Sequence, residues 1–209
     1  MEYLVVILVL VVFLQTRITD LRRAVVCLAC QSLIIALACF GQGLAHGASL
    51  HSLLPGLLTL AVKVIFIPGA VLRLVKELTN EREIVSESNV NYSTLAAAAF
   101  LIFGYELVQR ILPGIAVRDI LASSIMMIMT GLSLMVLRKR AIIQIVGLIT
   151  LENGIYLLGL LMTEGLPLIV ELGVFLDVLI AVVVLVILTS RMRLSFMTTD
   201  TTVMRKLKG

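Results

Sequence analysis

Apolar residues along this chain come in long blocks that are separated by short polar breaks. Seven blocks reach or approach the roughly 20 residues that a helix needs to cross the core of a bilayer. They cover residues 2–18, 23–45, 52–75, 92–112, 118–137, 141–163 and 166–190. The pattern therefore predicts seven transmembrane helices. Because no extended soluble domain remains for catalysis, any redox chemistry would fall to a partner protein.

Composition agrees with this interpretation. Of the 209 residues, 60% are hydrophobic and 14% are charged, whereas a soluble domain has about 25% charged residues. The mean hydropathy is +1.13. We therefore expect an all-α integral membrane protein. Cys27, Cys30 and Cys39 share one apolar block, which favours small packing residues over a disulfide framework.

The basic residues predict the orientation of the helices. Lys and Arg gather at every second break and in the tail 191–209, so that one side has fourteen of them and the other only Arg110 and Arg118. Cytoplasmic loops carry such an excess of basic residues. We expect the N-terminus outside, the C-terminus in the cytoplasm, and a bacterial or archaeal cytoplasmic membrane as the location.

Four ionisable residues fall at depth within the predicted helices. Lys63, Glu152 and Asp177 are close to the middle of the third, sixth and seventh blocks, and Glu106 lies in the fourth, nearer the outer face. A charge at the bilayer centre costs roughly 2.5–3.5 kcal/mol. A carboxylate at that depth is too short to reach water about 15 Å away, although Glu106 could reach the interface.

Two interpretations remain for these groups. They form a structural pair between helices, with Lys63 opposite one of the acids, or they handle protons. Burial disfavours the charged forms of both amines and carboxyls, so that such groups can exchange a proton near neutral pH. We predict a proton relay of Glu152, Asp177 and Lys63, with Glu106 as an outward branch. Pro68, five residues after Lys63, predicts a disturbed helix with a freed carbonyl at Val64.

Small residues predict close packing of two helices. Ala96 to Ala99 lie in the fourth block, and Gly147, Gly154 and Gly159 lie in the sixth. Residues of this size let helix backbones approach one another in a membrane.

The segment GLSLMVLRKRAIIQIVGLITLENGIYLLGLL, from Gly131 to Leu161, resembles the small K subunit of complex I and the C subunit of Mrp-type antiporters. Both have a glycine-bearing helix, a basic turn and a second helix with an acid. The segment ELGVFLDVLIAVVVLVIL from Glu171 resembles the last span of that family. The resemblance implies a K-like segment over 116–190, after an additional four-helix segment over 1–115. It also implies relay carboxyls at Asp177 and at Glu152, although the K-family glutamate aligns with Ile149.

The whole chain, including LTLAVKVIFIPGAVLRLV from Leu58, resembles the E component of hydrogenase-4. That family belongs to membrane-bound nickel–iron hydrogenase and formate hydrogenlyase complexes. The resemblance implies a non-redox membrane-arm subunit that helps to couple electron transfer to the movement of H⁺ or Na⁺.

The same resemblance implies the cofactors and partners. No cofactor or metal is expected in this chain, while a nickel–iron centre and iron–sulfur clusters are expected in partner subunits. The partners would be antiporter-like and complex I H-like membrane subunits, soluble hydrogenase subunits and the lipid bilayer, with no nucleic acid. The alternatives are a subunit of an Mrp-type antiporter or other complex I-like machine, and a structural membrane spacer.

Overall fold

A computed structural model describes residues 2–45, 50–76, 87–114 and 117–162, together with the single positions 179, 182, 183, 186 and 189. Over these residues the chain is helical and forms no strand, which confirms the all-α prediction for this part. The helices are α1 (Glu2–Arg17), α2 (Leu21–Ala45), α3 (Leu50–Thr59), the π-helix η1 (Leu60–Phe66), α4 (Ile67–Lys76), α5 (Glu87–Ile111), α6 (Arg118–Leu137) and α7 (Ala141–Met162).

The first six apolar blocks correspond to these helices within a few residues, with α3, η1 and α4 forming the third. Five stretches are long and apolar enough to cross a membrane, namely Leu21–Leu44, Gly56–Arg73, Val90–Ile111, Arg118–Leu137 and Ala141–Gly159, and Tyr3–Arg17 is a shorter one. These helices indicate a multi-pass membrane protein. The predicted seventh span and the tail lie outside the described residues except for five single positions, so the count of seven and the orientation stay predictions.

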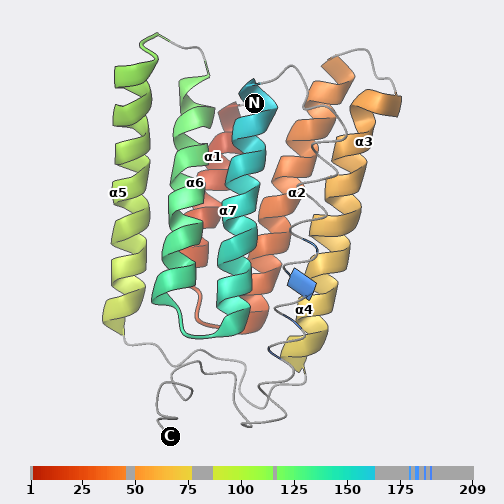
Figure 1. Cartoon of the computed structure of the whole chain (residues 1–209), viewed down its shortest axis with the longest axis vertical. Helices are drawn as coiled ribbons and strands as arrows, with labels where there is room; N and C mark the ends of the chain where they lie inside the picture. Colours follow the sequence, from red (N-terminus) through yellow and green to blue (C-terminus); the bar gives the residue numbers. More distant parts are fainter. Residues whose placement is uncertain are drawn as a thin grey trace, which may run out of the picture.

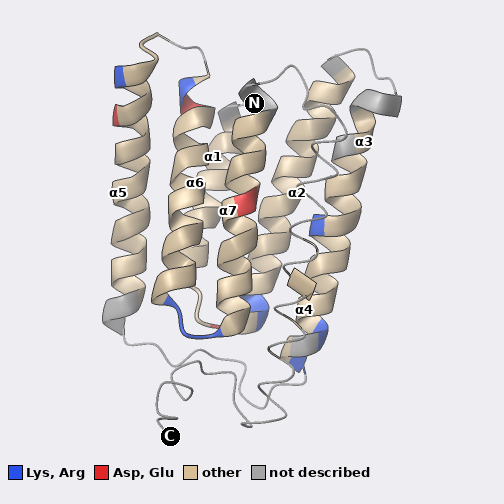
Figure 2. Ribbon diagram, viewed as in Figure 1, with Lys and Arg blue, Asp and Glu red and all other residues tan. Residues whose placement is uncertain are grey.

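The helices run side by side along the long axis of the molecule (Figure 1). α7 packs against α6 and α2, α5 packs against α6, and α1 contacts α2, α5 and α6. The α1–α2 and α6–α7 turns lie at one end, which we call the basic end because Lys and Arg gather there (Figure 2). The α5–α6 turn lies at the opposite end.

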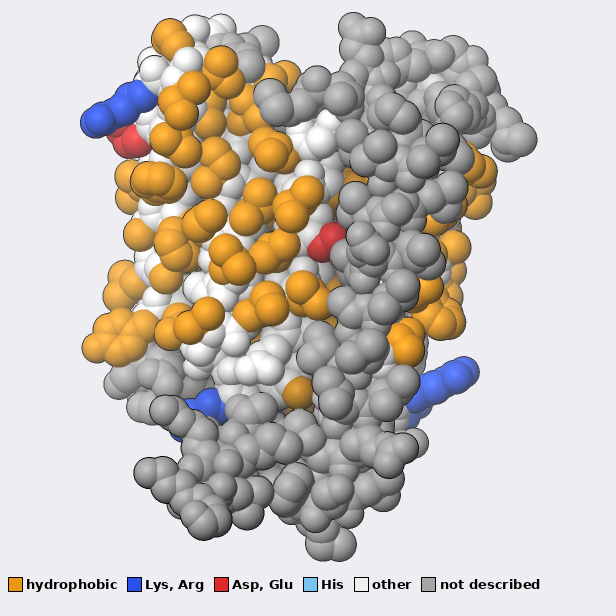
Figure 3. Space-filling model, viewed as in Figure 1, with side chains coloured by type: hydrophobic (Ala, Val, Ile, Leu, Met, Phe, Trp, Pro, Cys, Tyr) orange, Lys and Arg blue, Asp and Glu red, His pale blue; other side chains and the backbone are white. Residues whose placement is uncertain are grey.

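Hydrophobic side chains cover most of the described surface in the face shown in Figure 3. Large apolar residues on α5 and α6 are well exposed, among them Leu95, Ile102, Phe103 and Val136. Such a continuous apolar surface is what a helix bundle presents to lipid or to partner helices.

Two apolar clusters fill the interior of the bundle. The basic-end cluster joins α2, α4 and α7 through Leu21, Ala24, Val25, Leu28, Ile67, Val71, Val75, Ile142, Ile143, Ile145, Val146 and Ile149, with Val182. The far-end cluster joins α1, α2, α5, α6 and α7 through Val5, Leu8, Val12, Ile35, Cys39, Ala97, Ile120, Met126, Met127, Tyr156 and Leu157. α2 and α7 contribute to both clusters, so these two helices connect the two halves of the core.

α6 and α7 approach closely enough for their backbones to touch. A Cβ on Gly131 would lie 2.5 Å from the Leu151 nitrogen and 2.6 Å from the Gly147 oxygen. A Cβ on Gly147 would in turn lie 2.8 Å from the Gly131 oxygen, and one on Gly154 would lie 2.9 Å from the Ile128 nitrogen. The close packing predicted for Gly147 and Gly154 is therefore confirmed.

We predict that Gly131→Ala lowers the melting temperature of the purified chain in detergent. The added methyl group must push α7 away from α6, and overpacking of this kind costs about 1–3 kcal/mol. Gly41→Ala on α2 is the matched control, because a Cβ there would meet nothing within 4 Å. Equal melting temperatures for the two variants would contradict the close backbone contact.

Candidate functional site

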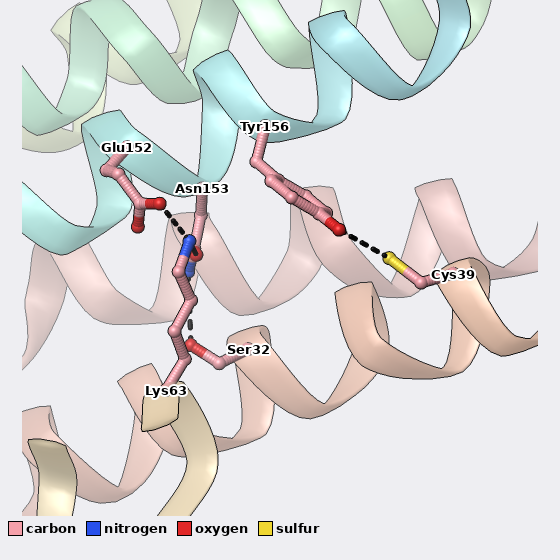
Figure 4. Close-up of polar contacts among 6 residues, drawn as sticks. All are labelled: Ser32, Cys39, Lys63, Glu152, Asn153 and Tyr156. Atoms are coloured by element: carbon pink, nitrogen blue, oxygen red, sulfur yellow. Dashed lines mark hydrogen bonds and ion pairs between the residues drawn. The ribbon is translucent and has the colours of Figure 1, made fainter. Parts of the chain in front are cut away.

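The centre of the site is an ion pair between the third predicted span and α7. Lys63, in η1, is fully buried, and Glu152, at the midpoint of α7, is 3% exposed. The Lys63 ammonium forms an ion pair with Glu152 Oε1, and Nζ also donates to Asn153 Oδ1 at 3.1 Å (Figure 4). Two of the residues predicted to act together are therefore in direct contact.

Asn153 connects this pair to α2. Its Oδ1 accepts from Lys63, and its Nδ2 donates to Ser32 Oγ at 3.2 Å. Both side chains are fully buried. The amide thus uses both of its ends, which fixes the position of the ammonium relative to α2 and α7.

Tyr156 covers the ammonium one helical turn further along α7. The centroid of its ring lies 5.1 Å from Lys63 Nζ, within the range of a cation–π contact. The Tyr156 hydroxyl accepts a weak hydrogen bond from the Cys39 thiol of α2 at 3.5 Å (Figure 4). Residues 152, 153 and 156 share one face of α7 because residues three and four apart are neighbours on a helix.

The local backbone around Lys63 is a π-helix. The N–H of Ile67 bonds to the carbonyl of Val62, five residues back, and Lys63 is the central residue of Leu60–Phe66. The next residue is Pro68, which has no N–H to offer to Val64. The disturbance predicted from Pro68 takes this form, and π-helical turns of this kind are frequent at functional sites.

One oxygen of the Glu152 carboxylate has no partner in the ion pair. Glu152 Oε2 is buried and has no hydrogen-bond partner among the described residues. A buried carboxylate oxygen without a donor is costly. This oxygen can therefore take up a proton or accept from a water molecule.

The other two predicted relay residues do not join this cluster in the described part of the chain. Asp177 lies outside the described residues. Glu106 is on α5 with its side chain 66% exposed, and its Oε2 lies 3.8 Å from Arg110 Nε, four residues on. This geometry favours the interfacial alternative for Glu106.

Sequence reasoning did not identify Ser32, Cys39 or Tyr156 as parts of the site. The spacing of Tyr156 from Glu152 was the available signal, since it places the ring and the carboxylate on one helical face. Ser32 and Cys39 carried no signal of their own, because small polar residues are common in membrane helices.

The described residues include no group of three or more His, Cys, Asp or Glu side chains that could hold a metal ion. The groups that the site does contain are an amine, a carboxyl, an amide, a phenol and a thiol. The amine, carboxyl, phenol and thiol can each bind or release a proton, while the amide only donates and accepts hydrogen bonds.

Fold and site thus define a helical, multi-pass membrane protein with a buried lysine–glutamate pair. The chain is 33% identical over 157 residues to the uncharacterized protein Rv0085 of Mycobacterium tuberculosis, a match that covers 73% of this chain and 71% of that protein. It belongs to the same family as this mycobacterial protein. No family model matches the chain, and no solved structure matches it.

We predict that Lys63→Met and Glu152→Gln each strongly destabilise the protein. The double variant should lose much less stability than the sum of the two single losses. Removing one partner of a buried pair costs about 3–5 kcal/mol, because it leaves the other without compensation, whereas removing both is far less costly. The stabilities of the unsubstituted protein, the two single variants and the double variant are compared by thermal unfolding in detergent.

The exposed pair of Glu106 and Arg110 provides the control. Glu106→Gln should change stability by less than about 1 kcal/mol, as is typical for surface ion pairs. Strictly additive effects of the Lys63 and Glu152 substitutions would argue against a coupled pair.

Proposed function

We propose that this protein is a membrane-arm subunit of a respiratory-type hydrogenase complex, in which Lys63 and Glu152 relay protons. The observation that carries the proposal is the buried contact between these two side chains at the middle of the helices. The hydrogenase part rests on the resemblance of the whole chain to hydrogenase-4 component E.

The pair supports proton transfer because its proton can sit on either group without a change in the net charge of the pair. With the ammonium and the carboxylate both ionised, the net charge is zero. If the proton moves from Nζ to the carboxylate, both groups become neutral and the net charge is still zero. A low-dielectric environment tolerates both states, so a charge that arrives nearby can decide between them.

The geometry favours H⁺ over Na⁺ as the ion at this point. The Lys63 ammonium already occupies the position between Glu152 Oε1, Asn153 Oδ1 and the Tyr156 ring. These are the oxygen and ring contacts that a bound cation would need. A sodium ion would have to displace a covalently attached cation that is fully buried.

We also propose that residues 166–190, which lie almost entirely outside the described part of the chain, form a seventh span with Asp177 at the depth of the pair, and that residues 116–190 constitute the K-like segment. The basic end faces the cytoplasm of a bacterial or archaeal cell. The exposed apolar faces of α5 and α6 contact lipid or antiporter-like and H-like membrane subunits, while soluble partners hold the nickel–iron and iron–sulfur centres.

Substitution of Glu152 in the assembled complex tests the relay. We expect Glu152→Gln to reduce proton translocation by at least about tenfold, because an amide cannot take up and release a proton in the way a carboxyl group does. Hydrogenase activity with a soluble electron carrier should be retained. Proton uptake by sealed vesicles and hydrogen turnover are measured on the same preparation.

Glu106→Gln is the matched control, since it makes the same chemical change on the exposed surface of α5. Normal translocation in Glu152→Gln with normal assembly would contradict the relay and leave the structural-spacer alternative. Asp177→Asn, measured alongside, tests the expected second carboxyl.

Affinity purification of the tagged chain from its native membrane tests the identity of the complex. We expect subunits that carry nickel and iron–sulfur clusters to be recovered with it. Recovery of antiporter-like subunits without nickel would instead support the Mrp-type alternative.

A further inference from the structure

A second group of buried polar side chains lies about one helical turn from the ion pair, toward the basic end. Gln15 of α1 donates from Nε2 to Thr150 Oγ1 of α7 at 2.9 Å, and Thr150 Oγ1 lies 3.3 Å from Gln31 Oε1 of α2. None of the three side chains is more than 2% exposed. We call Gln15, Thr150 and Gln31 the glutamine–threonine cluster.

Two buried atoms of this cluster lack a hydrogen-bond partner among the described residues. Gln15 Oε1 is an acceptor and Gln31 Nε2 is a donor. Each such buried group costs about 1–3 kcal/mol if it stays unpaired. Buried water can donate to such an acceptor and accept from such a donor, as it commonly does for buried polar groups.

The Thr150 hydroxyl can also switch its direction. It lies 2.8 Å from the carbonyl oxygen of Val146 and 3.3 Å from Gln31 Oε1, yet it has only one proton to donate. Rotation about the C–O bond therefore makes or releases a hydrogen bond without any movement of the helices.

The cluster and the ion pair involve neighbouring residues on two helices. Gln31 is followed by Ser32, which accepts from Asn153, and Thr150 lies one turn before Asn153 on α7. A rise of 1.5 Å per residue separates Thr150 and Asn153 by about 4.5 Å along the axis.

Polar groups also lie between the cluster and the basic end. Thr16, the neighbour of Gln15, has its carbonyl bound by the guanidinium of Arg138, which lies in the α6–α7 turn. The hydroxyl groups of Thr16 and Thr94 lie 3.2 Å apart. A line of buried polar groups therefore leads from the basic end to the centre of the bundle.

The side of the ion pair toward the opposite end is different. Beyond the contact between Tyr156 and Cys39, the far-end cluster places Leu8, Ile35 and Met127 in the described interior. Two buried hydroxyl groups on this side, those of Ser123 and Ser124, donate to the carbonyls of Asp119 and Ile120 on their own helix. Unlike Gln15 and Gln31, these two side chains leave no unpaired buried atom for water to satisfy. Water is thus favoured more on the basic side of the pair than on the opposite side.

We infer that the glutamine–threonine cluster is a hydrated passage that gives protons one-sided access to Glu152 from the basic end. The role in proton movement rests on the proposed function, whereas the hydration does not. Each proton that water delivers to the Glu152 carboxylate is replaced on that water by one from the basic end, so no water is consumed.

Thiol accessibility tests this inference on the full chain in sealed membrane vesicles. In a background with Cys27, Cys30 and Cys39 changed to Ala, Thr150→Cys is compared with Leu157→Cys, two turns further along α7. Both positions are buried, with Leu157 in the far-end cluster. The probe is a small, charged, membrane-impermeant methanethiosulfonate reagent, applied to each side of the membrane in turn.

We expect the thiol at position 150 to react at least about tenfold faster than that at 157, because the reactive thiolate forms only where water is present. The faster reaction should occur only with reagent on the side of the basic end. Gln31→Cys and Ile35→Cys on α2 form a second matched pair, in case a substitution on α7 disturbs folding.

Equal slow reaction at 150 and 157, or faster reaction from the opposite side, would overturn the inference. This outcome is distinct from failure of the proposed function. Reactive thiols together with normal translocation by Glu152→Gln would leave the passage intact and remove the relay. Loss of translocation in Glu152→Gln together with unreactive thiols would support the relay and overturn the hydrated passage.

Discussion

The structure depends on how a fully buried lysine is compensated at the centre of an apolar bundle. Insertion of one charge at that depth costs roughly 2.5–3.5 kcal/mol, and neighbouring groups must offset this cost. Glu152 supplies the opposite charge, Asn153 an amide oxygen and Tyr156 a ring face. All three come from one face of α7, so this helix has to turn that face toward the Lys63 side chain in one register. The backbone contact between Gly131 and Gly147 then fixes α6 against α7.

This compensation is compatible with function because it is incomplete. A structural pair would gain most from the satisfaction of every donor and acceptor, yet Glu152 Oε2 has no hydrogen-bond partner among the described residues. The π-helix around Lys63 keeps its hydrogen bonding but shifts it to the fifth residue back, as between the Ile67 N–H and the Val62 carbonyl. The unpaired carboxylate oxygen is an acceptor that a purely structural pair does not require. The exchange of a proton with water does require such an acceptor.

The first six helices and the mid-helix positions of Lys63 and Glu152 could be predicted from the sequence, because both follow from counting along the chain. Lys63 and Glu152 were expected at mid-helix, and they meet there. The rotation of each helix about its axis cannot be counted in this way. The sequence therefore left open which acid pairs with Lys63. It also left open whether Glu106 points into the bundle or, as the structure has it, away from it. Gln15, Gln31 and Thr150 were missed because uncharged polar residues are tolerated in membrane helices, and only packing brings these three together.

The position of the acid within α7 suits the position of Lys63 on η1. The proposed resemblance of α6 and α7 to the K subunit aligns the glutamate of that family with Ile149, which here is fully buried in the basic-end cluster beside α2 and α4. An acid at 149 would replace an apolar contact in that cluster. Three residues on, the carboxylate meets Lys63 of η1. Residue 152 is therefore a position at which Lys63 can compensate the acid, because the pair forms only where the two side chains share one depth.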